Sequence, residues 1–135
     1  RRMYRAYLDH WEYGIDTGQE ILAPTWEQLK ALILELDEDK QTLVTYGDEE
    51  AGDYMAVGGG NGRYICYLSY DDEEKIFILV DETVSPDSSE EVELVTGGQR
   101  GRFHRRECVS LPAVLTAAET YYRTHAPDAG LCWQE

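Results

Sequence analysis

Alternating apolar and polar positions run through the middle of the chain, as in β-strands that are covered on one face. Both faces of the segment 63–70 carry apolar or aromatic side chains, so we expect that strand to be central and covered on both sides. Asn61-Gly62 precedes it, and because both residues tolerate positive φ this pair favours a hairpin turn over a phosphate loop. Further strands are expected at residues 4–11, 42–46, 54–57, 76–80, 92–95 and 102–109.

Two helices are predicted from apolar residues spaced three and four apart. The first covers about residues 25–38, and Thr25 and Gln28 form a capping box at its start. Its apolar stripe is Trp26, Leu29, Leu32, Ile33 and Leu36. The second covers about residues 111–124 and is capped by Ser110. Its expected inward stripe is Leu111, Leu115, Ala118 and Tyr122. These elements predict an α+β fold, an antiparallel sheet of about five to seven strands with two main helices.

The size and composition of the chain suit one domain covering residues 1–135, because 42% of the residues are hydrophobic and can supply a core. The chain has an odd number of cysteines, and no two of them form a C-x-x-C pair: Cys66, Cys108 and Cys132. This pattern favours reduced thiols over a zinc site, and a single disulfide between two of them is the remaining alternative. The sequence contains no apolar run of membrane-spanning length and no signal-peptide pattern at residues 1–4. We therefore expect a cytoplasmic protein that does not contact a membrane.

The formal net charge of −15 is concentrated in one part of the chain. Residues 35–93 contain 18 carboxylates and 3 basic residues, a sum of 3 − 18 = −15, whereas the remainder has 9 of each. Such a surface repels nucleic acid and anionic lipid and speeds encounter with a basic partner; the alternative is that it only aids solubility. Asp37, Glu38 and Asp39 fall at the predicted end of the first helix, where the helix dipole disfavours negative charge. That placement suggests a role outside the helix.

No known catalytic motif is present. The histidines His10, His104 and His125 are isolated, and H-x-E, H-E-x-x-H and G-x-S-x-G patterns are missing. Carboxylate pairs could serve a hydrolase, but many of the acids sit in turns rather than in the partly buried positions that catalysis favours. The sequence therefore favours a binding protein without cofactor or metal over a small carboxylate-dependent enzyme.

Four arginines form a basic stretch towards the C-terminus, at Arg100, Arg102, Arg105 and Arg106. Four positive charges on a chain of net charge −15 do not favour nucleic-acid binding. We expect them to pair with the protein's own acidic residues or to anchor one carboxylate of a partner. Trp133, close to the C-terminus, is expected to pack against the fold and hold the tail in place.

Several segments between Gly58 and Trp133 together resemble immunity protein family 1 of bacterial polymorphic toxin systems. They are the Gly-Asn-Gly hairpin leading into residues 63–68, the strand that ends in Leu79-Val80-Asp81, the Gly97-Gly98 turn, Cys108-Val109-Ser110 with the helix that follows, and the terminal Leu131-Cys132-Trp133. Before residue 40 only the order of elements matches.

The resemblance implies a cytoplasmic antidote that binds a basic toxin domain, often a deaminase that attacks cytosine, in a 1:1 heterodimer and without nucleic acid or membrane. The acidic part of the chain would occupy the place of the toxin's nucleic-acid substrate. A generic DNA-mimicking inhibitor is the remaining alternative. Charge and position in turns select ten candidate toxin-binding residues: Asp48, Glu49, Glu50, Asp53, Asp71, Asp72, Glu73, Glu74, Asp81 and Glu82.

Overall fold

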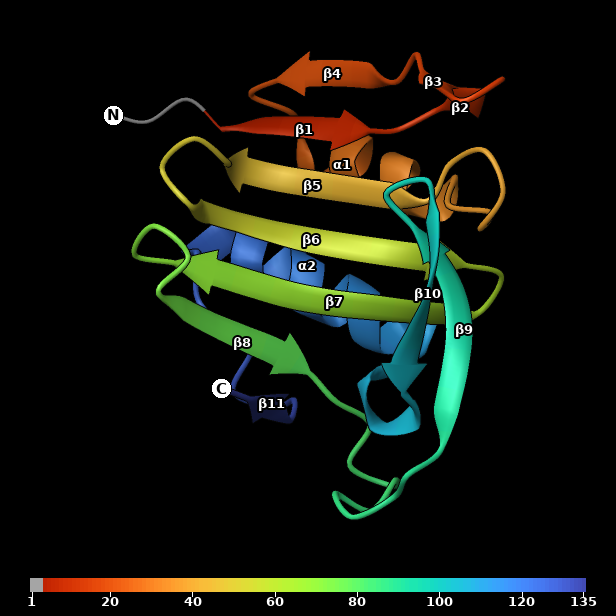
Figure 1. The fold of residues 1–135 in the computed structure, drawn as a ribbon. Helices are drawn as coiled ribbons and strands as arrows, with labels where there is room; N and C mark the ends of the chain where they lie inside the picture. Colours follow the sequence, from red (N-terminus) through yellow and green to blue (C-terminus); the bar gives the residue numbers. More distant parts are fainter. Residues whose placement is uncertain (1–3) are drawn as a thin grey trace.

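The computed structural model describes residues 4–135 and is built on an antiparallel sheet of seven strands with two helices behind it (Figure 1). The strand order is β11-β8-β7-β6-β5-β1-β4. Its strands are β1 (Arg5–Leu8), β4 (Gln19–Leu22), β5 (Leu43–Asp48), β6 (Asp53–Gly60), β7 (Arg63–Tyr70), β8 (Lys75–Leu79) and β11 (Trp133–Gln134). The predicted α+β class is confirmed.

Two small hairpins and three helical segments complete the fold. One hairpin pairs β2 (Trp11–Glu12) with β3 (Ile15–Asp16), and the other pairs β9 (Glu91–Thr96) with β10 (Gln99–His104). The helices are α1 (Trp26–Leu34), the short 3-10 helix η1 (Arg105–Glu107) and α2 (Leu111–Thr124). In Figure 1 the β9–β10 hairpin lies across the front of the sheet, on the side opposite α1 and α2.

The strand β7 is central and covered on both faces, as its sequence predicts. Tyr64, Cys66 and Leu68 point into the main core beneath the helices, where Leu68 is fully buried. On the other face, Ile65 packs in a second cluster with Leu94 and Cys108, which the β9–β10 hairpin and the segment after it supply. Burying a large apolar side chain stabilises a fold by roughly 1.5–3 kcal/mol, so the two cores hold β7 firmly between its neighbours.

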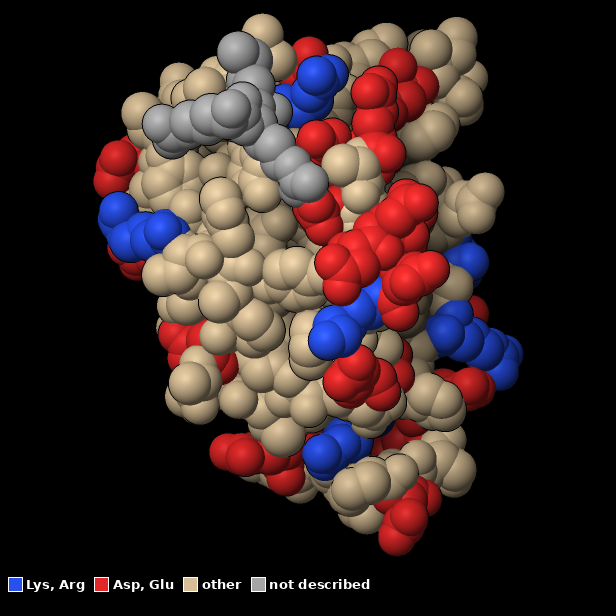
Figure 2. All heavy atoms as spheres, turned by 90° about the vertical axis from the view of Figure 1, so that its left-hand side faces the viewer, with Lys and Arg blue, Asp and Glu red and all other residues tan. Residues whose placement is uncertain are grey.

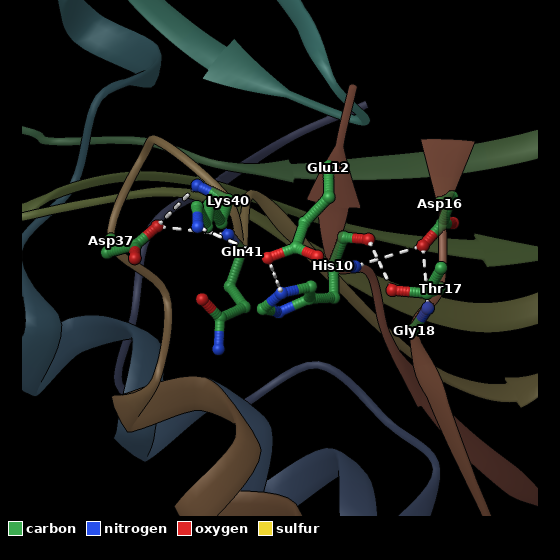
Figure 3. A network of polar contacts seen from close by, with 8 residues as sticks. All are labelled: His10, Glu12, Asp16, Thr17, Gly18, Asp37, Lys40 and Gln41. Atoms are coloured by element: carbon green, nitrogen blue, oxygen red, sulfur yellow. Dashed lines mark hydrogen bonds and ion pairs between the residues drawn. The ribbon is translucent and has the colours of Figure 1, made fainter. Parts of the chain in front are cut away.

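The first helix is shorter than the expected 25–38, because α1 ends at Leu34. Its capping box is present: Gln28 N donates to Thr25 Oγ1 at 3.1 Å, and Thr25 N donates to Gln28 Oε1 at 2.9 Å. Beyond the helix, Asp37 Oδ1 accepts hydrogen bonds from three successive backbone N–H groups, those of residues 39–41, at 2.9–3.0 Å. Figure 3 shows the two from Lys40 and Gln41. The interpretation that places Asp37 at a helix end is therefore wrong, since its carboxylate closes a turn.

The second helix agrees with the expected range, but the inward stripe is shifted. The fully buried residues of α2 are Val114, Ala117, Ala118 and Tyr121. Leu111, Leu115 and Tyr122 lie at the margin and are only partly buried. The two alanines let the helix axis approach the sheet, so the face centred on them is the one that is covered. Periodicity alone cannot tell this face from its neighbour.

Two of the predicted strands have different bounds. The segment 102–109 is not one strand, because β10 ends at His104 and η1 follows it. The segment 4–11 divides into β1 and the start of β2, and the short strand β3 follows it. The strand β4, for which no expectation was made, then pairs with β1 at one edge of the sheet.

The C-terminal tail is held against the other edge of the sheet, as expected. Trp133 pairs with Leu79 in the β11–β8 ladder, and its Nε1 donates to the carbonyl oxygen of Asp128 at 3.0 Å. Among residues 4–135, no helix is long and apolar enough to cross a membrane.

Candidate functional site

Two acidic turns lie at the same end of the sheet because the strands between them run antiparallel. One turn joins β5 to β6, and the other joins β7 to β8. Strands that meander bring every second turn to the same end. Both turns are therefore at the left-hand end of the sheet in Figure 1, although about 20 residues separate them in sequence.

The two turns touch each other directly. The backbone N–H of Asp71 donates to Asp53 Oδ1 at 3.0 Å, and the hydroxyl of Tyr54 donates to Glu73 Oε2 at 2.9 Å. Gly52 packs against the backbone of Asp72 so closely that a Cβ atom at residue 52 would lie 2.4 Å from Asp72 Cα. The turns thus form a single surface, which we call the twin-turn surface, consisting of Asp48, Glu49, Glu50, Asp53, Asp71, Asp72, Glu73 and Glu74.

The carboxylates of the twin-turn surface face solvent to different degrees. Asp48 and Asp53 are half-buried, and the other six residues are exposed. Glu49 accepts a hydrogen bond from Thr45 Oγ1, and Glu73 accepts one from Tyr54. Within the described part of the chain, the side chains of Glu50, Asp72 and Glu74 make no hydrogen bond or ion pair. Those three carboxylates are available to a partner.

The backbone of the second turn is held in an uncommon conformation. Asp71, Asp72 and Glu73 have φ values of +54°, +57° and +68°, in the left-handed region that non-glycine residues seldom adopt. Successive residues in this conformation persist when the surrounding structure fixes them, and here the contacts with Gly52 and Asp53 do so. The turn is therefore a defined shape rather than a flexible loop.

Acidic side chains gather on part of the face that these turns present. Figure 2 shows this end of the molecule, where Asp and Glu side chains gather in a band that single Lys or Arg side chains interrupt. Burial, with hydrogen bonds to Tyr67 and Glu73, raises the pKa of the Tyr54 phenol beneath the surface. Tyr54 therefore stays protonated and keeps donating to Glu73 throughout the physiological pH range.

The remaining two candidates, Asp81 and Glu82, lie apart from the twin-turn surface. They follow the far end of β8, at the opposite end of the sheet. Asp81 accepts hydrogen bonds from Thr83 N and Oγ1 and pairs with Arg105 at 3.4 Å. The hydrogen bonds from Thr83, helped by the Arg105 charge, lower the pKa of Asp81. The structure thus brings eight of the ten candidates together and separates these two.

A cleft of about 260 Å³ lies beside Asp81 and Glu82, between the loop after β8, the start of α2 and the C-terminal tail. Its lining combines apolar side chains, such as Val109 and Leu131, with the hydroxyl of Ser110 and the thiol of Cys132. No group of three or more His, Cys, Asp or Glu residues within residues 4–135 is placed to hold a metal ion.

Three of the four arginines in the basic stretch pair with carboxylates of the protein itself, and the fourth, Arg106, donates from Nη1 to the carbonyl oxygen of Val84. Arg100 lies 3.7 Å from Glu93 and Arg102 lies 3.6 Å from Glu91, both across the β9–β10 hairpin. Together with the pairing of Arg105 and Asp81, these contacts agree with the first of the two expected roles, pairing within the protein, for three of the four arginines.

The comparison with known protein families identifies the family of this chain. The family model described as "Immunity protein Imm1" matches residues 17–135. The chain belongs to the Imm1 family. No curated protein matches the chain significantly. Membership extends the resemblance noted in the sequence towards the N-terminus, and it makes the chain an immunity protein, a role that implies a cognate toxin as partner.

One polar cluster of this Imm1 protein escapes sequence reasoning. Asp9 is 3% exposed, and its carboxylate accepts hydrogen bonds from Thr42 N at 2.6 Å, Leu43 N at 2.9 Å and Trp11 Nε1 at 2.7 Å, as well as from Thr42 Oγ1. A buried carboxylate of this kind ties the β2–β3 hairpin to the sheet. Thr42 and Leu43 lie 33 and 34 residues from Asp9, so no local pattern marks the cluster, although Trp11 is close in sequence.

Proposed function

We propose that this Imm1 protein neutralises a bacterial toxin that modifies nucleic acid, a cytosine deaminase, by covering the toxin's active site with the twin-turn surface. The complex is a 1:1 heterodimer in the cytoplasm of the producing cell, and the immunity protein acts by binding without catalysing a reaction. The observation that carries this proposal is the set of free carboxylates, at Glu50, Asp72 and Glu74, on a surface of fixed shape.

The sign of the charge supports a toxin that acts on nucleic acid. Such an enzyme binds phosphates through Lys and Arg side chains around its active site. A chain of net charge −15 that presents a band of carboxylates on this face is complementary to the basic surface around such an active site. Because arginine forks bind carboxylates and phosphates in the same bidentate geometry, the twin-turn surface can occupy the positions of the phosphates and exclude the substrate.

The rigidity of the surface supports tight inhibition. A partner that binds flexible acidic loops must order them, which lowers the affinity. Here the contacts of Asp53 with Asp71 and of Gly52 with Asp72 already hold both turns in place. Opposite charge then speeds the encounter of the two proteins, and the fixed shape slows their dissociation.

The test removes charge from the twin-turn surface without touching the fold. A triple variant, Glu50→Gln, Asp72→Asn and Glu74→Gln, replaces side chains that have no partner among the described residues. We expect its Kd for the toxin domain encoded beside its own gene to rise by about 10-fold or more at low salt, mostly through slower association. The wild-type affinity itself should fall as the ionic strength rises.

A matched control changes the same amount of charge elsewhere. Asp87→Asn, Glu90→Gln and Glu135→Gln replace three exposed carboxylates that also lack side-chain partners within residues 4–135. Both triple variants have a formal charge of −15 + 3 = −12. Equal losses in the two variants would indicate a general charge effect. If reversing every charge of both turns leaves affinity and protection in cells unchanged, the proposal is wrong.

The same experiment separates the rival functions. A generic DNA mimic would also bind unrelated basic proteins, whereas an immunity protein should discriminate sharply against them. A carboxylate-dependent enzyme would show a turnover that depends on pH. Inhibition of one toxin only, in a complex of equal stoichiometry, is the outcome that the proposal requires.

A further inference from the structure

The β2–β3 hairpin carries the most exposed apolar side chains of the described chain. Tyr13 at its tip is 102% exposed, and Ile15 beside it is 63% exposed. Single exposed apolar residues are ordinary. Two of them together on a short projecting hairpin form a small apolar tip that no part of residues 4–135 covers.

The backbone at this tip adopts an unfavourable conformation that no packing of the Tyr13 side chain offsets. Tyr13 and Gly14 form the two-residue connection between Glu12 and Ile15, with φ values of +51° and +76°. Turns with two positive φ values favour Asn, Asp or Gly at the first position and disfavour large side chains. Because the Tyr13 side chain is fully exposed, its contacts within the protein cannot explain why a tyrosine stands at this position. A strained residue that does not contribute to stability indicates a role in function, such as contact with a partner.

The base of the hairpin is braced by a polar network, so the tip is held in a fixed position (Figure 3). Asp16 Oδ1 accepts hydrogen bonds from His10 N and Gly18 N, both at 2.9 Å, and the Glu12 carboxylate lies 3.3 Å from Lys40 Nζ. Thr17 N donates to the carbonyl oxygen of His10 at 2.7 Å. A rigid aromatic anchor loses little conformational freedom on binding.

Trp11 fixes the hairpin to the rest of the protein. Its backbone N–H donates to the carbonyl oxygen of Lys40 at 2.9 Å, and its indole N–H donates to Asp9. Gly98, in the β9–β10 turn, packs against the indole ring so closely that a Cβ atom there would lie 2.4 Å from Trp11 Cε2. The hairpin therefore moves with the sheet and with the β9–β10 hairpin as one unit.

Two observations indicate which kind of partner binds this tip: the charges around it, and the residues that the family model matches. The hairpin carries Glu12 and Asp16, and the adjacent turn carries the exposed Asp39 together with Lys40, which pairs with Glu12. The local charge of these four residues is 1 − 3 = −2. The surroundings of the tip thus suit an apolar pocket with a basic rim and disfavour an anionic membrane. The Imm1 model matches residues 17–135, so Tyr13 and Ile15 lie outside the part of the chain that the family pattern explains.

We infer that the β2–β3 hairpin is a second toxin contact, in which Tyr13 and Ile15 insert into an apolar pocket of the cognate toxin and determine which toxin is recognised. This inference rests on the proposed function. The hairpin and the twin-turn surface lie at opposite ends of the sheet (Figure 1), and β6, eight residues at roughly 3.3 Å each, spans about 26 Å between those ends. A toxin that contacts both must therefore form an interface longer than β6, larger than the standard roughly 800 Å² per partner.

The test uses substitutions that remove the apolar tip while favouring the turn. Tyr13→Asn places the preferred residue at this position, so the urea midpoint should stay equal or rise, while the Kd for the toxin domain encoded beside the gene should rise about 30-fold. Ile15→Thr keeps a β-branched residue in β3 and should weaken binding in the same direction. Leu34→Gln, which removes a 53% exposed leucine on α1, is the matched control and should leave binding unchanged.

Each other outcome overturns the inference in a recognisable way. If the wild type does not bind the toxin domain, the proposed function and the inference both fail. If the wild type binds and Tyr13→Asn binds equally well, only the inference fails. A lower urea midpoint for Tyr13→Asn would show that the fold uses the tyrosine. Dimerisation of the free protein, or binding to phosphatidylglycerol vesicles, that Tyr13→Asn abolishes would assign the tip to a second copy or to a membrane instead.

Discussion

The buried carboxylate of Asp9 should be among the most sensitive polar positions of the fold. Its Oδ1 accepts from two backbone N–H groups, those of Thr42 and Leu43, and its Oδ2 accepts from the Thr42 hydroxyl and the Trp11 indole. Asp9→Ala removes all four acceptor contacts from a site that is 3% exposed. Asp9→Asn keeps one oxygen and turns the other into a donor that faces the indole N–H.

The expected losses of stability follow from this geometry. In Asp9→Ala, two backbone N–H groups and one indole lose a charged acceptor, and breaking a buried charged network costs about 3–5 kcal/mol. In Asp9→Asn the retained oxygen still serves the two backbone groups, and the Thr42 hydroxyl can rotate to accept. Only the bond from Trp11 is lost, so this variant should lose about 1.5–3 kcal/mol.

Urea unfolding followed by circular dichroism measures both losses, with Asp39→Ala as the control. Asp39 is exposed, and its side chain has no partner within residues 4–135, so its removal makes the same change from a net charge of −15 to −14 without touching the network. The control should be neutral or slightly stabilised, because the chain repels itself. Equal stability of Asp9→Ala and Asp39→Ala, or a larger loss for Asp9→Asn than for Asp9→Ala, would refute the reasoning.

Two further predictions concern the contact between the acidic turns and the titration of a tyrosine. Gly52→Ala should be destabilised by about 2–4 kcal/mol, because its Cβ would meet the backbone of Asp72 at 2.4 Å in addition to the cost of positive φ. Gly62→Ala is the control, because residue 62 also has positive φ but a Cβ atom there meets nothing, so its loss of stability measures the cost of positive φ alone. Similar losses of stability in the two variants would contradict a tight contact between Gly52 and Asp72. Burial and the hydrogen bond to Asp16 raise the pKa of Tyr7 to about 12. The folded protein therefore keeps a proton between pH 10 and 12 that the unfolded chain releases, and stability should fall as the pH rises through this window. Tyr7→Phe should make the decline of the urea midpoint less steep, and an unchanged slope would count against this assignment.

Local signals were enough for the elements whose geometry depends on neighbouring residues. The capping box of Thr25 and Gln28 is an interaction over three residues, and Asn61 and Gly62 both have positive φ in the predicted hairpin turn. The helix α1 was predicted too long, because Leu36 continues the apolar stripe although it is buried from the turn beyond the helix. Periodicity reports which residues are covered and does not report whether they are helical.

For the candidate site, too, some features could be predicted from the sequence and others depend on the tertiary structure. Composition showed that residues 35–93 hold the excess negative charge, and turn positions indicated which carboxylates face solvent. Their grouping depends on the meander of β5 to β8, which brings Asp53 and Asp71 together and leaves Asp81 at the far end. The hairpin tip at Tyr13 gave no sequence signal, because its exposure depends on how β2 and β3 leave the sheet.

The sequence by itself determined the class of fold, the concentration of negative charge in residues 35–93 and the resemblance to the Imm1 family, since each depends on residue types and short spacings. The tertiary structure decided which acids are neighbours, which are neutralised and which are free. It also placed Asp9 beneath Thr42 and Leu43, across 33 and 34 residues of sequence. The physical reason is that side-chain pairing acts over a few ångströms in space, whereas a sequence pattern records only distance along the chain.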